Sequence, residues 1–271
     1  MGQYWFYVNI DRGQSTTCLG KMGEFFGTVD TAEIIAAIAV PANAPADYEK
    51  PKKGNGSWAG DRIMLIGDYA HEWPKSVLEG DGGDSFADIE PNEYADQRRA
   101  KVQWTTDATD QYPIDRTWVL RNLDKKIYVR SNGIPSGYMQ RGNAILSYHG
   151  DTCPFASPGL GDVLLGRIGW SQDDSCAMLS GDYFNLTQGD WVGDRFDARL
   201  LDDVKEQLES EGWTDGTNEE AIRLRGIWNL EFPGQEEITE EDEKREGYTM
   251  VWKFKRGPDG RVRDLSGVEV K

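Results

Sequence analysis

Hydrophobic residues gather in short runs that are rich in aromatic and β-branched types, which favours strands. Residues 3–10, Gln-Tyr-Trp-Phe-Tyr-Val-Asn-Ile, predict a strand close to the first residue. Further strands are predicted at Arg62–Ile66, Thr117–Leu123 and Lys126–Arg130. Because only Asp124-Lys125 separates the last two runs, we expect a hairpin there.

Helical periodicity occurs in fewer places. Asp30–Val40 predicts a helix with an isoleucine-rich face, and Pro41 ends it. Leu201–Glu211 predicts a second helix that ends at Gly212. The apolar stretch Leu160–Trp170 is compatible with a buried strand or with a short helix.

The C-terminal sequence predicts a hairpin. Gly247–Arg256 and Arg261–Val270 flank Pro258-Asp259-Gly260, in which proline fixes φ and glycine permits positive φ. Taken together, the pattern predicts an α+β fold with a mostly antiparallel sheet, a few helices and a C-terminal β-hairpin. No break in composition divides the chain, so we expect a single globular domain, 1–271.

A five-residue motif occurs twice. Trp58-Ala-Gly-Asp-Arg62 reappears as Trp191-Val-Gly-Asp-Arg195, and tryptophan is rare enough that a chance second copy is improbable. Two pseudo-equivalent halves, 1–135 and 136–271, are one interpretation, and shared turn chemistry is another. A Gly-Asp-Tyr sequence follows the first copy at 67–69 but precedes the second at 181–183, which argues against a simple tandem duplication.

These residues resemble a family of uncharacterised, mainly fungal proteins. The resemblance rests on the Met1-Gly-Gln-Tyr-Trp start, Gly23-Glu-Phe-Phe, Trp58-Ala-Gly-Asp-Arg-Ile with Gly67-Asp-Tyr, Leu120-Arg-Asn-Leu, and Trp191-Val-Gly-Asp-Arg-Phe. It spans most of residues 1–200 and implies a recurrent fold. No activity follows from it, because the family has no established function.

The motif admits a structural and a functional interpretation. In the structural one, tryptophan fills a core pocket, Gly60 permits a tight turn, and Asp61 caps the turn while pairing with Arg62 or another arginine. In the functional one, both copies line a ligand cleft, with tryptophan as a stacking surface and arginine as a fork for carboxylate or phosphate. The candidate ligand-binding residues are Trp58, Asp61, Arg62, Asp68, Tyr69, Trp191, Asp194 and Arg195.

The net charge of the chain favours some classes of binding partner over others. The chain has 47 acidic and 30 basic residues and a net charge of −17, so nucleic acid and anionic membranes are disfavoured. A cationic ligand, a basic protein surface or solubility alone fits this balance. Three cysteines give no paired spacing, and neither a signal peptide nor a membrane span is indicated, so we expect a cytoplasmic protein.

Known catalytic patterns are absent from the sequence. With two histidines and no paired cysteine spacing, no metal site is expected. P-loop, dinucleotide-binding and Gly-x-Ser-x-Gly patterns are also missing, so no cofactor is expected. We therefore favour a binding or interaction module for a small ligand or a protein. The alternatives are a carboxylate- and arginine-dependent hydrolase or transferase acting on a sugar- or nucleotide-like substrate, and motifs that are purely structural.

Overall fold

A computed structural model represents the protein. It describes residues 2–26, 29–45, 47–80, 82–99, 110–113, 116–134, 159–173, 184–231, 254–256 and 262–264.

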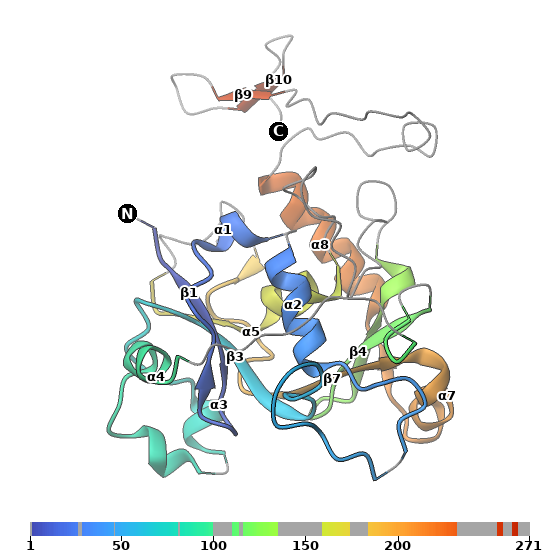
Figure 1. Ribbon diagram of the computed structural model, residues 1–271. Coiled ribbons are helices and arrows are strands. Elements are labelled where there is room, and N and C mark those ends of the chain that lie inside the picture. Colours follow the sequence, from blue (N-terminus) through green and yellow to red (C-terminus); the bar gives the residue numbers. More distant parts are fainter. Residues whose placement is uncertain are drawn as a thin grey trace.

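A mostly antiparallel sheet crosses the molecule (Figure 1). Its strand order is β2-β1-β3-β7-β4-β5-β8, and β6 pairs with β3 off this path. The β6–β3 and β5–β8 pairs are parallel and the others are antiparallel. The strands are β1 (Trp5–Asn9), β2 (Gln14–Ser15), β3 (Asp61–Gly67), β4 (Trp118–Asn122), β5 (Ile127–Arg130), β6 (Gly169–Trp170), β7 (Arg195–Leu200) and β8 (Thr214–Asp215).

Helices cover both faces of this sheet. The main core lies under α1 (Met22–Phe25), α2 (Val29–Ile38), α5 (Leu160–Ile168) and α8 (Thr217–Glu231). The other face is covered by α3 (Lys75–Leu78), the 3₁₀ turn η1 (Gly83–Phe86), α4 (Pro91–Gln97) and α7 (Leu201–Ser210). A second 3₁₀ turn, η2 (Ser131–Gly133), follows β5. The predicted α+β class is therefore confirmed.

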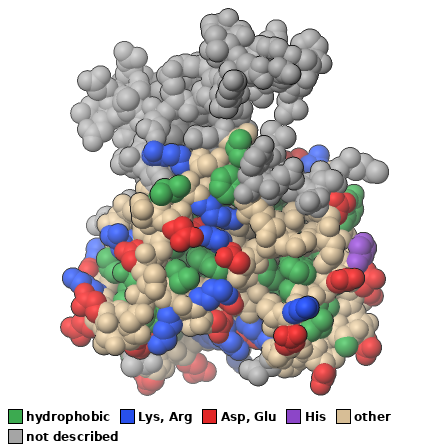
Figure 2. All heavy atoms as spheres, turned by 180° about the vertical axis from the view of Figure 1, so that it is seen from behind, with side chains coloured by type: hydrophobic (Ala, Val, Ile, Leu, Met, Phe, Trp, Pro, Cys, Tyr) green, Lys and Arg blue, Asp and Glu red, His purple; other side chains and the backbone are tan. Residues whose placement is uncertain are grey.

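The buried strands explain the continuous aromatic runs in the sequence. Trp5 and Tyr7 of β1 enter the main core, whereas Phe6 and Val8 enter the cluster on the opposite face. Strand side chains alternate between faces, and both faces here are covered, so every position of β1 is buried. The space-filling view of Figure 2 shows acidic, basic and apolar side chains interleaved over the face turned to the viewer.

Most of the elements expected from periodicity form. The helix predicted at Asp30–Val40 is α2, and that at Leu201–Glu211 is α7. The ambiguous stretch Leu160–Trp170 is a helix, α5, followed by the two-residue strand β6. In the C-terminal region β9 (Phe254–Arg256) pairs antiparallel with β10 (Val262–Asp264), and the turn predicted between them lies outside the described residues.

The two Trp-x-Gly-Asp-Arg motifs meet at the centre of the sheet. Strands β3 and β7 pair through Asp61 with Phe196 and through Arg62 with Arg195. The Gly60 N–H donates to the Phe196 carbonyl at 2.7 Å, and the Ile63 N–H donates to the Asp194 carbonyl at 3.2 Å. We call this pairing the motif joint. It connects the strands β2, β1, β3 and β6 to the strands β7, β4, β5 and β8.

The pairing of the two motifs does not by itself decide whether the chain consists of the halves 1–135 and 136–271. The main core draws on residues from β1 through α8, so it spans the point at which halves 1–135 and 136–271 would divide. In the part of the chain that the structure describes, no helix has the length and apolar character needed to cross a bilayer.

Candidate functional site

Both motifs form the same tight turn. The Asp61 N–H donates to the Trp58 carbonyl at 3.1 Å, and the Asp194 N–H donates to the Trp191 carbonyl at 3.1 Å. The third residue of each turn is glycine with positive φ, 77° at Gly60 and 81° at Gly193. A bond from the fourth residue to the first, with positive φ at the third, defines a type II turn, which explains the glycine.

We predict unequal costs when a methyl group is added at these glycines. An L-residue in left-handed backbone costs about 1–2 kcal/mol, so we expect Gly60→Ala to lower the free energy of unfolding by that amount. At Gly193 a Cβ would lie 3.1 Å from Val77 and 3.2 Å from Ser76, whereas at Gly60 no atom lies within 4 Å. We therefore expect Gly193→Ala to cost more, as measured by urea unfolding.

The control for this prediction is Gly60→Asn, because asparagine tolerates left-handed backbone better than alanine. Equal or negligible losses at the two glycines would contradict the prediction.

Each motif aspartate accepts hydrogen bonds from an asparagine and a lysine. Asp61 accepts from Asn9 at 2.9 Å and pairs with Lys50. It also accepts from Arg12 Nε at 3.0 Å. The carboxylate is thus surrounded by donors of the protein itself.

Asp194 has a similar set of donors. It accepts from Asn122 at 2.7 Å and pairs with Lys125. Burial raises the pKa of Asp194, and the bonds from Lys125 and Asn122 oppose that rise.

Each motif arginine pairs with an aspartate of a neighbouring hairpin loop. Arg62 donates from Nε to Asp11 Oδ1 at 2.7 Å, and its backbone N–H donates to Asp11 Oδ2 at 2.8 Å. The Arg195 backbone N–H donates to Asp124 at 2.6 Å, and its Nη1 donates to the same carboxylate at 3.2 Å. Because strand side chains alternate, Asp61 and Arg62 lie on opposite faces of the sheet.

The motif tryptophans lie in the main core. Trp58 is 0% exposed and Trp191 is 3% exposed, so neither presents a ring face to solvent. Trp58 Nε1 donates to Gln14 Oε1 at 2.9 Å, and the Arg167 guanidinium lies 5.4 Å from the Trp191 ring centroid. Burial in the core is what the structural interpretation of the motif expects for both tryptophans.

The remaining two candidates lie at the far end of β3. Asp68 and Tyr69 are half-buried, and Asp68 Oδ1 accepts the Tyr4 backbone N–H at 2.9 Å. The motif joint therefore brings Asp61, Arg62, Asp194 and Arg195 together where β3 and β7 pair, while Asp68 and Tyr69 lie beyond the other end of β3. Among the eight candidates, Asp68 is the one that lines a described pocket.

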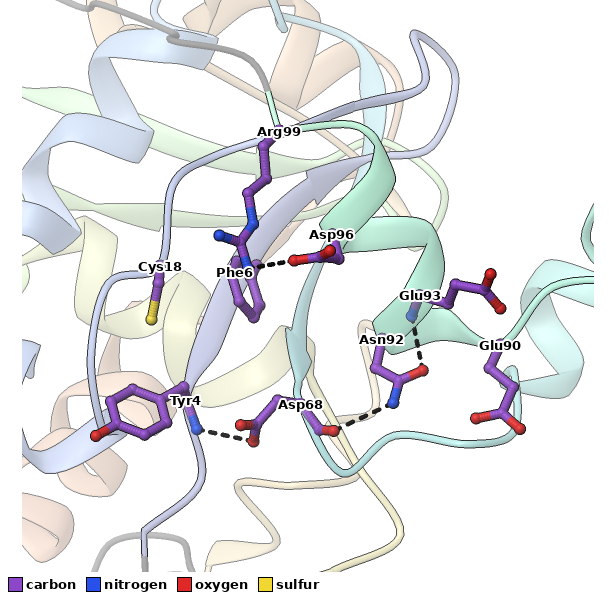
Figure 3. Close-up of a pocket in the computed structure, with 9 residues that line it drawn as sticks. All are labelled: Tyr4, Phe6, Cys18, Asp68, Glu90, Asn92, Glu93, Asp96 and Arg99. Carbon is purple, nitrogen blue, oxygen red and sulfur yellow. Dashed lines mark hydrogen bonds and ion pairs between the residues drawn. The ribbon is translucent and has the colours of Figure 1, made fainter.

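That pocket is an open surface hollow of about 570 Å³ between β1 and α4 (Figure 3). Its lining residues are Tyr4, Phe6, Cys18, Asp68, Glu90, Asn92, Glu93, Asp96 and Arg99. They come from β1 and the residue before it, from the segment after β2, from the end of β3, and from α4 and its flanks.

Four carboxylates line the pocket against one guanidinium. Arg99 pairs with Asp96, and its guanidinium lies 5.1 Å from the Phe6 ring centroid. Tyr4 is 45% exposed, which is high for an aromatic residue, and Cys18 is an exposed free thiol. The pocket thus combines excess negative charge with aromatic surface.

The remaining polar contacts hold the pocket in shape. Asn92 Nδ2 donates to the Asp68 carbonyl at 3.2 Å, and Asn92 Oδ1 accepts the Glu93 N–H at 2.6 Å. Glu90 pairs with His71 at 2.8 Å. The described residues contain no group of three or more His, Cys, Asp or Glu side chains arranged to hold a metal ion. No three of the four carboxylates therefore converge on one point.

This pocket was not predicted from the sequence. Its residues belong to three segments, near positions 4–18, at 68 and at 90–99, and only the fold brings them together. The acidic excess of the chain was the one available signal, and it points to the type of partner without locating the site.

Comparison with known proteins adds no assignment. No protein-family model matches the sequence, and no curated protein or solved structure matches it either. Membership of the fungal family described above stays a prediction.

Proposed function

We propose that the protein is a non-enzymatic binding module, acting in the cytoplasm, which takes a cationic group of a small ligand or of a protein into the pocket between β1 and α4. The observation that carries this proposal is the pocket's lining of four carboxylates, one guanidinium and two aromatic rings. An ammonium or guanidinium group suits such a lining, because carboxylates attract it and a ring face stabilises it further.

The pocket already holds a guanidinium of its own. Arg99 lies over Phe6 while pairing with Asp96, so an aromatic ring and a carboxylate together position a planar cation at one side of the hollow. Asp68, Glu90 and Glu93 lie along the remaining wall, and Tyr4 offers the exposed ring. A second cation beside Tyr4 would meet the same pair of chemical groups.

We assign the two motifs to the scaffold of this module. Both aspartates and both arginines make charged hydrogen bonds within the protein, and both tryptophans are buried. A hydrolase or transferase built on them would have to break these pairs before binding substrate, and this favours binding at the pocket over catalysis at the motifs.

The proposal predicts that Nα-acetyl-arginine amide, whose one charge is its guanidinium, binds and that Nα-acetyl-citrulline amide, its uncharged counterpart, does not. In Asp68→Asn/Glu93→Gln, we expect binding to weaken about tenfold, because partly exposed ion pairs contribute up to about 1 kcal/mol each. Isothermal titration measures this at low salt, and the affinity should fall as ionic strength rises. Both substitutions keep an oxygen acceptor for the Tyr4 N–H and for Gln97.

The charge-matched control is Glu206→Gln/Glu209→Gln, which removes two exposed carboxylates of α7 away from the pocket. Alkylation of Cys18, followed by peptide mapping, locates the site independently, since an occupied pocket should slow the reaction. Equal binding of the charged and uncharged amides, or equal losses in the two double variants, would refute the proposal.

A further inference from the structure

The surroundings of the two motifs correspond strand by strand. Strand β1 runs from Trp5 to Asn9, and β4 runs from Trp118 to Asn122; both have five residues. Asn9 pairs with Ile63, which lies two residues after the first motif aspartate. Asn122 pairs with Phe196, which lies two residues after the second. β1 and β4, which both begin with tryptophan and end with asparagine, therefore have the same register relative to their motifs.

The hairpin loops after these strands also correspond. The Arg12 N–H donates to the Asn9 side chain at 2.9 Å, and the Lys125 N–H donates to the Asn122 side chain at 3.0 Å. One residue later, Gly13 and Lys126 have positive φ, 58° and 52°. Each loop also binds its motif arginine through backbone and side chain, as Asp11 and Asp124 do.

The helices before the motifs follow the same plan. The Trp58 N–H donates to the Ala37 carbonyl at 2.8 Å, and the Trp191 N–H donates to the Arg167 carbonyl at 3.0 Å. Ala37 and Arg167 are each the penultimate residue of their helix.

The residues that follow the two helices pair crosswise. Ala39, after α2, bridges to Ala198 of β7. Gly169, after α5, pairs with Leu65 of β3. Leu65 and Ala198 occupy the same position, four residues after their motif aspartates. Each helix thus leads into a residue that pairs with the strand of the opposite motif.

We infer that Tyr4–Asp68 and Thr117–Leu201 are two structurally equivalent units, related by a pseudo-twofold axis that passes between Arg62 and Arg195. The antiparallel pairing of these two arginines places identical motif positions opposite each other, as an axis of that kind requires. In the motif joint, each copy of the motif therefore pairs with the other copy. These units differ in their bounds from halves divided at residue 135.

The unequal length of the units conceals the repeat in the sequence. Asn9 and Asp61 are 52 residues apart, whereas Asn122 and Asp194 are 72 residues apart, so the second unit is longer by 72 − 52 = 20 residues. The hairpins and the motifs therefore recur at different offsets, and only the compact motif remains recognisable.

The equivalence ends at the pocket, and this step rests on the proposed function. The counterparts of Tyr4, Phe6 and Asp68 in the second unit are Thr117, Val119 and Leu201. Val119 packs in a cluster beneath α7, and α7 begins at Leu201. Of the two units, only the first therefore contributes lining residues to this pocket, and the second unit has the helix α7 at the corresponding place.

Matched substitutions test the equivalence without any ligand. Asn9→Ala and Asn122→Ala each remove a donor to a motif aspartate and an acceptor in the hairpin loop. We expect both to lower the melting temperature by about 4–10 °C and to agree within about 3 °C, since losing equivalent buried hydrogen bonds has similar cost. A marked fall in one variant with a change below about 1 °C in the other would overturn the inference.

Amide exchange in the unmodified protein gives a second test that needs no variant to fold. The Ile10 N–H donates to the Arg62 carbonyl at 3.0 Å, and the Leu123 N–H donates to the Arg195 carbonyl at 2.8 Å. We expect both amides to be protected, with protection factors within about tenfold of each other. An unprotected amide at one of the two positions would overturn the inference, and failure of Nα-acetyl-arginine amide to bind would leave it standing.

Discussion

Replacement of Asp197 by alanine is expected to lower the free energy of unfolding by about 3–5 kcal/mol, because it leaves a buried arginine without its counter-ion. Arg121 donates to Asp197 through two parallel bonds, Nε to Oδ1 at 2.7 Å and Nη2 to Oδ2 at 2.6 Å. The two side chains are only 5% and 6% exposed. Urea unfolding followed by circular dichroism measures the loss.

An exposed aspartate in a comparable ion pair supplies the control. Asp202 pairs with Arg116 at the surface, where the two side chains are 68% and 46% exposed. We expect Asp202→Ala to cost less than about 1 kcal/mol, because water solvates the arginine that remains. If Asp197→Ala costs no more than Asp202→Ala, the pair between β4 and β7 contributes nothing beyond a surface ion pair.

Removal of the Trp58 side chain is expected to lower the free energy of unfolding by about 3–5 kcal/mol, because a large cavity then opens in the main core. The indole is 0% exposed, and its loss also deprives Gln14 of a hydrogen-bond donor. Trp58→Ala tests this in urea unfolding, and Trp58→Phe should recover part of the loss by filling most of the space.

Trp213→Ala is the matched control, because Trp213 is half-buried at the edge of the small cluster under α7. We expect a clearly smaller effect there. If Trp58→Ala keeps its urea midpoint but binds Nα-acetyl-arginine amide less tightly, the assignment of Trp58 to the scaffold is wrong.

The sequence is most informative where local patterns decide the structure. The aromatic run near residue 5, the isoleucine-rich face of α2 and the amphipathic α7 were all predicted, because burial on a strand or on one helix face leaves a visible period. The tight turn of the motif was one of the two interpretations of the sequence, which left the partner of Asp61 open between Arg62 and another arginine; in the structure it is Arg12.

The remainder depends on contacts between distant segments. Helix α8 was not predicted: it buries Leu224 and Ile227 but leaves Ile222 and Leu230 exposed, so its apolar stripe is unclear. The partnership of Asn9 with Asp61 could not be predicted either, because an asparagine in a strand carries no sign of its partner. The pocket is hidden for the same reason.

The crosswise pairing behind α2 and α5 has a consequence for how the chain could be divided. Separating the two units would break the pairing of β3 with β7 at Arg62 and Arg195. It would also remove Gly169 from its place beside β3 and Ala39 from its place beside β7. Two largely buried central strands would then become open edges, with unpaired backbone groups able to recruit strands from other molecules. Each unit therefore covers a strand edge of the other unit, and this protects that edge from pairing with other molecules.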